Sequence, residues 1–325
     1  MIVVTGGAGF IGSAIVWKLN HLGKTNIIIV DELGKAEKWK NLVGLKYDDF
    51  VNKLDFIEQV LDDVLPYNIE AIIHMGANSS TTEKDADHLM NNNFHYTKEL
   101  AKYCLEKNIR FIYASSAATY GDGDLGFDDN ESKLETLRPL NMYGYSKQLF
   151  DLWAMRNKVL DKIVGIKYFN VYGPNESHKG DMRSVVHKAF EQVRDYGKVN
   201  LFKSLHPDYR DGEQKRDFVY IKDAVEMTLF FLEHKDKNGL YNVGGGTART
   251  WNALVTALFN AVGKPVNIEY VDMPEHLAEK YQYFTEANLG KIKKAGYRNP
   301  LYSLEDGVTD YVKNYLLKKK NLGEE

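Results

Sequence analysis

Short, wholly apolar runs alternate along the first half of the chain with segments whose apolar residues recur at helical spacing. The apolar runs predict buried strands at 2–4, 26–30, 71–74, 110–115 and 163–167. The spacing predicts helices at 13–22, 56–64 and 98–107, and a further helix that begins near Tyr143. Strands without polar alternation are buried on both faces, as in a parallel sheet covered by helices. The repeated strand–helix order therefore predicts an α/β fold with a Rossmann-type, doubly wound parallel sheet.

The pattern loosens after about residue 175. Helices are predicted at 182–196 and 224–233, strands at 218–221 and 240–243, and a long polar loop at 204–215. The segment 272–283 is irregular, and Ser303 is a candidate N-cap of a last helix. We expect a first domain over residues 1–175, with a later segment at about 215–245 returning to it. Residues 176–325 are expected to form mostly a smaller C-terminal α/β domain that binds the substrate.

Composition narrows the class of protein. Of the 325 residues, 44% are hydrophobic and 27% are charged, which is ordinary for a globular protein. The net charge of −3 argues against a nucleic-acid binder, and no apolar run approaches the ~20 residues that a membrane span needs. The single cysteine, Cys104, excludes an intrachain disulfide. The apolar N-terminus lacks the basic segment of a signal peptide, so we expect a cytoplasmic protein. We expect no metal site.

A glycine-rich turn follows the first predicted strand and opens the first helix. In Thr5-Gly6-Gly7-Ala8-Gly9-Phe10-Ile11-Gly12, Gly6 permits the tight turn, Gly9 lets the backbone approach a pyrophosphate, and Gly12 lets helix and strand pack closely. Asp31 ends the second strand about 20 residues later, where a carboxylate can accept hydrogen bonds from ribose hydroxyls. The turn therefore predicts a bound dinucleotide.

The residues after the second strand leave the choice between NAD and NADP open. Asp31 and Glu32 favour NAD, because two carboxylates would repel a 2′-phosphate. Lys35, Lys38, Lys40 and Lys53 follow and could neutralise that phosphate, which favours NADP.

Three residues form a candidate catalytic group. Tyr143 and Lys147 are four residues apart, so a helix places them on one face. A nearby ammonium stabilises a phenolate, and such a tyrosine can take a hydroxyl proton while a hydride leaves the same carbon. Ser116 follows a predicted strand at the edge where ligands bind in this kind of fold, and it could hold the substrate oxygen beside Tyr143.

These motifs occur in the order typical of short-chain dehydrogenases, with the spacing of the extended branch that modifies nucleotide-linked sugars. Further segments narrow the resemblance: 74–83 with Ser-Ser-Thr-Thr-Glu, 141–147, 168–174 with Tyr-Gly-Pro, 178–180 with His-Lys-Gly, 215–220 and 281–285. Together they resemble the ADP-L-glycero-D-manno-heptose 6-epimerase family along nearly the whole chain. That family makes a heptose precursor of lipopolysaccharide. Its members are homo-oligomers, typically pentamers.

The resemblance implies specific residues for each ligand. For the cofactor it implies NADP, with NAD still possible, and the residues Phe10, Ile11, Asp31, Glu32, Lys38, Lys53, Met75, Gly76, Ala77, Asn78, Ser79, Asn92, Lys147 and Val171 beside the glycine loop. For the ADP-heptose it implies Asn170, Asp181, Lys188, Phe202, Lys203, Ser204, Arg216 and Tyr281. Arg216 is chemically suited to this role, because a guanidinium can bind a diphosphate through two parallel hydrogen bonds.

The implied reaction inverts C6 of ADP-D-glycero-D-manno-heptose through transient oxidation to a ketone and re-reduction by bound NADP. Tyr143 would act as acid/base on one side of the carbon, and Lys179, by resemblance, on the other. The chain departs from the family at Glu32, where a neutral residue is expected, and at Lys188, where a histidine is expected and His187 lies one position away. The loop after Ser204 is also longer.

Two alternatives remain. The first is another extended-family enzyme, a nucleotide-sugar 4-epimerase or 4,6-dehydratase. Ala117 and Ala118 count against a dehydratase, since an acidic residue usually follows the strand-end hydroxyl there. The second is a redox-sensing regulator that binds NADP without turnover, which would not need Ser116, Tyr143 and Lys147.

Overall fold

The computed structural model describes residues 1–275 and 281–324. Its largest element is a seven-stranded sheet with strand order β10-β6-β5-β4-β1-β2-β3, in which every neighbouring pair is parallel. The strands are β1 (Ile2–Thr5), β2 (Ile27–Asp31), β3 (Asp49–Asn52), β4 (Ala71–His74), β5 (Arg110–Ser116), β6 (Val164–Tyr168) and β10 (Gly239–Val243). All except β3 are almost wholly buried, as the apolar runs predicted.

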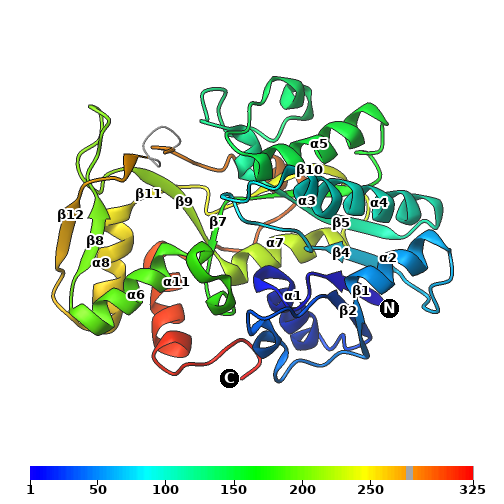
Figure 1. The fold of residues 1–325 in the computed structure, drawn as a ribbon, viewed down its shortest axis with the longest axis horizontal. Coiled ribbons are helices and arrows are strands. Elements are labelled where there is room, and N and C mark those ends of the chain that lie inside the picture. The colour runs from blue at the N-terminus through cyan, green and yellow to red at the C-terminus, as the bar shows by residue number, and fades with distance from the viewer. Residues whose placement is uncertain (276–280, 325) are drawn as a thin grey trace.

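Helices cover both faces of this sheet, so the prediction of a doubly wound α/β fold is confirmed (Figure 1). Helices α1 (Phe10–His21) and α7 (Ile221–Glu233) pack together on one face. The other face carries α2 (Lys53–Leu61), α3 (Ala86–Leu89), α4 (Tyr96–Glu106) and α5 (Met142–Arg156). The strand order reverses between β1 and β4, and a ligand crevice forms at such a point, beyond the carboxyl ends of the strands.

A smaller group of elements lies beside that edge (Figure 1). It contains the three-stranded sheet β11-β9-β7 and the parallel pair β12-β8. These strands are β7 (Asn170–Tyr172), β8 (Val199–Phe202), β9 (Lys215–Tyr220), β11 (Ala248–Thr250) and β12 (Ile268–Val271). The accompanying helices are α6 (Val185–Tyr196), α8 (Trp251–Val262) and α11 (Leu304–Asp310), whereas α10 (Gly290–Ala295) packs against β10 of the large sheet. The chain returns from this group to the large sheet through α7 and β10.

The differences from the predicted elements have local causes. Strand β3 was missed because its residues are polar or only half-buried, so it lacks an apolar run. The helix predicted at 182–196 begins at Val185, because Met182 ends a separate 3-10 turn. Ser303 caps α11 as predicted, since its hydroxyl accepts from the Asp306 N–H at 3.0 Å. Within the described ranges, no helix combines the length and apolar character that a membrane crossing requires.

Candidate active site

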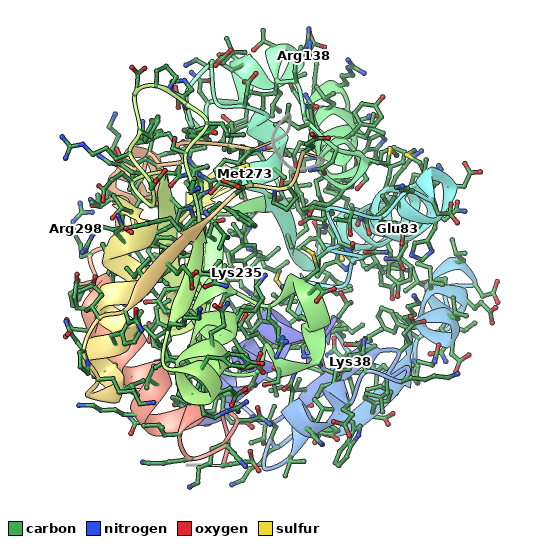
Figure 2. The ribbon with its side chains drawn as sticks, turned by 60° about the vertical axis from the view of Figure 1, so that its left-hand side comes forward. Lys38, Glu83, Arg138, Lys235, Met273 and Arg298 are labelled. Atoms are coloured by element: carbon green, nitrogen blue, oxygen red, sulfur yellow. The ribbon has the colours of Figure 1, made fainter. Side chains whose placement is uncertain are left out.

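A cleft of about 700 Å³ lies at the carboxyl ends of the central strands. The segments that carry Lys38 and Glu83 face each other across its opening in Figure 2. Its lining includes all four proposed catalytic residues: Ser116, Tyr143, Lys147 and Lys179. It also includes every residue predicted to contact the cofactor, from Gly6, Gly9 and Gly12 to Met75, Gly76, Ala77, Asn78, Ser79, Asn92 and Val171. Residues far apart in sequence therefore meet in one cavity.

The glycine loop is shaped to bring backbone close to a ligand. Gly6 has a φ of +64°, and a Cβ there would lie 2.7 Å from the Gly76 nitrogen on the neighbouring strand end. A Cβ on Gly12 would collide with the Gly6 carbonyl oxygen. Helix α1 starts just beyond, and Gly9 at its N-cap offers no side-chain acceptor, so the first N–H groups of the helix face the cleft unbonded by a cap. This cradle suits the pyrophosphate of a dinucleotide.

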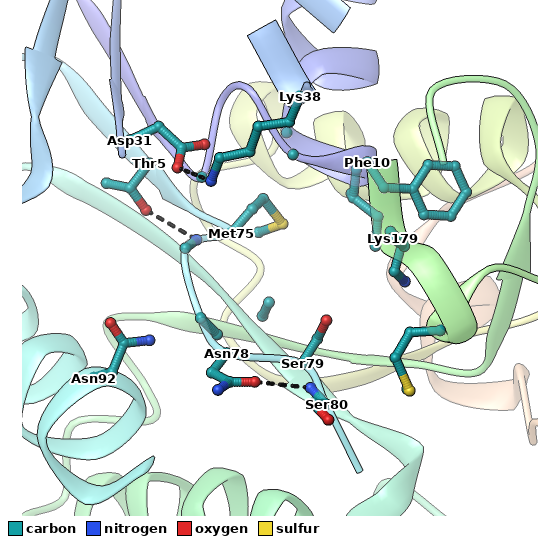
Figure 3. A pocket seen from close by; sticks show the side chains of 18 of the residues that line it. Thr5, Phe10, Asp31, Lys38, Met75, Asn78, Ser79, Ser80, Asn92 and Lys179 are labelled. Carbon is teal, nitrogen blue, oxygen red and sulfur yellow. Dashed lines mark hydrogen bonds and ion pairs between the residues drawn. The ribbon is translucent and has the colours of Figure 1, made fainter. Parts of the chain in front are cut away.

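Two lysine–carboxylate pairs stand where the ribose of such a dinucleotide would lie. Asp31 accepts from the Ala8 N–H at 2.9 Å and pairs with Lys38 at 2.6 Å (Figure 3). Glu32 pairs with Lys53 at 2.9 Å, and Lys53 also donates to the Asn92 side chain at 3.1 Å. The two carboxylates that favour NAD and the two lysines that favour NADP are thus adjacent, and each carboxylate is paired with a lysine.

Helix α5 aims two of the catalytic candidates at the cleft. The Asn141 side chain caps the helix by accepting from the Gly144 N–H at 2.8 Å. Lys147 donates to the Ala114 carbonyl at 2.8 Å, and burial lowers the pKa of its ammonium to about 8. Burial raises the pKa of Tyr143, although its hydrogen bond with Ser116 acts in the opposite direction. Burial thus outweighs the Ser116 hydrogen bond in its effect on the pKa of Tyr143.

Lys179 reaches the cleft from a different element, the 3-10 turn Ser177–Met182. Its ammonium lies over the Phe10 ring, 5.3 Å from the ring centroid, and the two side chains neighbour each other in Figure 3. Burial lowers the pKa of Lys179, and the negative charge of Glu176 opposes that shift. Glu176 also anchors this turn, because its carboxylate accepts from the Ser184 hydroxyl at 2.7 Å and from the Gly173 N–H at 3.3 Å.

Several cleft residues were not predicted. Thr5, Ser80, Tyr96, Tyr168, His178 and Met182 also line the cavity. Thr5 and Tyr168 end β1 and β6, so their strand-end positions were a signal that could have identified them. His178 belongs to the His-Lys-Gly segment, and its Nδ1 lies 3.2 Å from the side-chain amide nitrogen of Asn41.

The predicted substrate residues are less closely grouped. Asn170 lines the cleft and donates to the Asp217 carbonyl at 3.0 Å. The other seven lie outside its lining: Asp181, Lys188, Phe202, Lys203, Ser204, Arg216 and Tyr281. Arg216 is buried between the rings of Trp251 and Tyr281, at 5.8 and 5.3 Å from their centroids.

The structure places His187 and Lys188, the two candidates for one substrate contact, in different surroundings. His187 is buried and its Nδ1 lies 2.9 Å from the Tyr311 hydroxyl, so it belongs to the helix packing of the smaller group. Lys188 is half-buried and donates to the Asp181 carbonyl at 3.3 Å. Two residues predicted to meet the substrate are therefore in contact with each other.

No group of three or more His, Cys, Asp or Glu side chains suited to a metal ion occurs within 1–275 and 281–324. The cradle, the ribose-side carboxylate and the tyrosine–lysine pair instead define an extended short-chain dehydrogenase with a nicotinamide cofactor. In agreement, the chain belongs to the NAD dependent epimerase/dehydratase family, whose model matches residues 2–244.

Its full-length relatives are more specific. It is 57% identical over 316 residues to the ADP-L-glycero-D-manno-heptose-6-epimerase of Nitratidesulfovibrio vulgaris, covering 97% of this chain and 98% of that one. It is 51% identical to the protein of the same name from Fusobacterium nucleatum, covering 98% and 99%. The crystal structure of the Helicobacter pylori ADP-L-glycero-D-manno-heptose-6-epimerase superposes with a TM-score of 0.80 at 29% identity, covering 96% of this chain and 95% of that one.

Proposed function

We propose that this protein is an isomerase that converts ADP-D-glycero-D-manno-heptose to ADP-L-glycero-D-manno-heptose by inverting C6. The observation that carries the proposal is the convergence of two separate acid/base candidates, Tyr143 on α5 and Lys179 on the turn before α6, in the cleft that holds the dinucleotide cradle. The names of relatives at 57% and 51% identity support this substrate over that of a 4-epimerase or a 4,6-dehydratase.

We propose NADP as the cofactor. The glycine cradle and the α1 N-terminus would hold its pyrophosphate, and Asp31 would meet the ribose. Lys38 and Lys53 would turn from their carboxylate partners to the 2′-phosphate, which is a stronger acceptor for an ammonium group. Bound NADP supplies a reversible hydride acceptor, so C6 can pass through a ketone without net oxidation.

The protein residues move protons on both sides of C6. The two epimers present their hydroxyl groups on opposite sides of the carbon, so one fixed base does not serve both. Tyr143 exchanges the proton of one epimer while Ser116 holds the oxygen, and Lys179 exchanges the proton of the other. Burial lowers the pKa of Lys179, so the amine loses its proton more easily than that of an exposed lysine. A neutral amine can accept a proton, which suits Lys179 to this exchange.

The nucleotide end of the substrate would lie toward the smaller group of elements. Among the described residues, no carboxylate pairs with the Arg216 guanidinium, which donates to the Lys215 and Gln282 carbonyls and sits between two aromatic rings. A diphosphate would provide its missing counter-charge. We propose that Asn170 contacts the sugar and that Asp181, Lys188, Tyr281 and the segment Phe202, Lys203 and Ser204 approach the nucleotide when it binds.

The direct test incubates the purified protein with ADP-D-glycero-D-manno-heptose in deuterated water and follows C6 by NMR. We expect the L-epimer to appear with its original hydrogen at C6, because the hydride returns to the carbon that it left. Deuterium from solvent at C6 would refute the oxidation–reduction scheme. Epimerisation of UDP-glucose in place of the heptose would establish the 4-epimerase alternative, and bound cofactor without any turnover would establish the regulator.

We also propose a homo-oligomeric, cytoplasmic enzyme, following the family resemblance, with a pentamer as the expected state. Light scattering coupled to size-exclusion chromatography measures the molar mass directly. A mass equal to the 37.2 kDa of one chain would refute the oligomer.

A further inference from the structure

A buried ion pair lies directly behind the catalytic residues. Lys167 on β6 and Asp151 on α5 are 2.7 Å apart, and both side chains are almost completely inaccessible to solvent. The carboxylate of Asp151 also accepts from the Tyr113 hydroxyl at 2.9 Å and from the Ser115 hydroxyl at 2.7 Å. A buried ion pair is often no more stabilising than well-packed apolar residues, because both charges lose their hydration. Its presence here therefore calls for a role other than stability.

The pair connects the two elements that carry the catalytic group. Tyr143, Lys147 and Asp151 follow one another at intervals of four residues, so they share one face of α5. On the other side, Lys167 donates to the Thr119 hydroxyl at 2.7 Å, and that hydroxyl donates to the Ser116 carbonyl at 2.8 Å. Asp151 thus lies behind Lys147, and its partner Lys167 fixes the turn at Ser116.

We propose that Asp151 is a positioning residue of the active site, which holds Lys147 in its charged form and registers helix α5 against the strand end at Ser116, with Lys167 as its counter-charge. The inference rests on the proposed function only for the assay of turnover. It assigns to Asp151 and Lys167 a role that the sequence motifs did not indicate.

The charges around these groups make the proposal specific. Asp151 is faced by Tyr113 and Ser115 from β5, by Lys167 from β6, by Tyr120 from the turn after Ser116, and by Lys147 on its own helix. Burial lowers the pKa of Lys147 to about 8, and the charge of Asp151 opposes that shift.

Beside Asp151, His74 on β4 and Tyr143 on α5 are titratable neighbours of Lys147. Burial and the charge of Lys147 lower the pKa of His74 to about 3, so it stays neutral over the working range. Loss of the Asp151 charge should therefore deprotonate Lys147 at a lower pH.

The experiment compares Asp151→Asn, Lys167→Met and the double variant with the unmodified protein and a Tyr113→Phe control. The first readout is NADPH affinity against pH, from nicotinamide fluorescence, because Lys147 lines the cofactor cleft. The second is kcat/KM for epimerisation against pH. In both variants that lack the carboxylate, we expect the alkaline midpoint to fall by roughly 1 pH unit. Lys167→Met removes a cation and should not lower it, and Tyr113→Phe removes only a neutral donor.

The double variant removes the Lys167 ammonium together with its partner carboxylate, so it carries the test if Asp151→Asn alone does not fold. Unmoved midpoints in a folded variant that lacks Asp151, or an equal fall in Lys167→Met, would overturn the proposal and leave the pair with a purely structural role. Absence of epimerisation by the unmodified protein would refute the proposed function instead, while the fluorescence titration would still decide this inference.

Discussion

The two halves of the molecule gather their functional residues in different ways. In the half built on the large sheet, the glycine loop, Asp31, Met75 and Ser116 each follow or end a parallel strand. Parallel strands all point their carboxyl ends toward one edge of the sheet, so residues at those ends lie close together there. In the smaller half, the predicted substrate residues come from β7, the turn Ser177–Met182, α6, the end of β8, β9 and a segment beyond residue 280, and of these residues only Asn170 lines the cleft. A residue's place in the sequence thus determines its place in space only where the topology is regular.

The charged candidate residues of the two halves also have different partners. On the sheet side, Asp31, Glu32 and Asp151 all have lysine partners within 3 Å or less, which leaves a preformed electrostatic arrangement. In the smaller half, Lys203 likewise pairs with Asp272 at 2.9 Å, whereas the Arg216 guanidinium donates to the Lys215 and Gln282 carbonyls and lies against two rings. We infer that the cofactor side is preorganised and that the substrate side completes itself on binding. The predictions below test this contrast.

The largest expected effect lies where the two halves meet, at Tyr143 and Lys179. Tyr143→Phe and Lys179→Met should each reduce the rate of epimerisation by about 10²–10⁴-fold, because each removes an acid/base from one side of C6. Single-turnover rates measured by NMR provide the test. Both variants should retain NADP, since neither side chain is assigned to hold it. A Lys179→Met protein that epimerises at the unmodified rate would contradict the two-base mechanism.

The second prediction tests whether the glycine cradle is rigid before the cofactor binds, by adding one methyl group to it. Gly12→Ala should abolish cofactor retention and lower the unfolding free energy by about 2–4 kcal/mol, because the new Cβ meets the backbone of Gly6, which cannot move aside. Gly290→Ala is the control outside the cleft, at the start of α10, where the added Cβ would lie 3.0 Å from a movable Asn288 side chain. Chemical denaturation and bound-nicotinamide fluorescence measure both effects. Equal losses of unfolding free energy and of bound cofactor in the two variants would show that the glycine cradle is not preorganised.

The same contrast explains what could be predicted from sequence. Buried strands such as β1 and β2 were readable because a strand covered on both faces must be apolar. Strand β3 was not, because it is an exposed edge, and β8 and β12 were missed because they are short and only partly buried. The positions of Ser116, Tyr143 and Lys147 in one cleft followed from strand ends and helical spacing.

Other features depended on three-dimensional contacts that leave no local pattern. The Asp151–Lys167 pair joins residues on separate elements, and neither neighbourhood in sequence indicates a partner. The inward rotation of His187 toward Tyr311 likewise depends on where the C-terminal segment packs. The raised pKa of Tyr143 depends on the depth of burial, which a spacing of four residues does not specify.

A third, smaller effect concerns the choice of cofactor. Replacing Lys38 and Lys53 together by Ala should weaken NADP binding by roughly 10–100-fold while NAD binding changes little, since the two phosphate-directed charges together contribute about 1.4–2.8 kcal/mol. The ratio of the two dissociation constants, measured by fluorescence titration, is the readout. Lys35→Ala, which alters a lysine of the same loop that is not assigned to the phosphate, is the control. An unchanged NADP/NAD ratio would refute the assignment of Lys38 and Lys53.

The smallest effect is expected in the long loop of the substrate half, between Phe202 and Lys215. There His206 packs on the Tyr283 ring at 5.0 Å, but its side chain remains exposed. His206→Ala should change the unfolding free energy by less than about 0.5 kcal/mol, as surface substitutions usually do, and KM for the sugar nucleotide by no more than roughly twofold. Cofactor retention should not change, because the loop lies outside the cleft lining. Steady-state kinetics with saturating cofactor measures KM and kcat separately. A tenfold rise in KM would mean that this loop holds the substrate in a fixed geometry before binding. The substrate half would then be as preorganised as the glycine cradle, and the contrast between the two halves would be wrong.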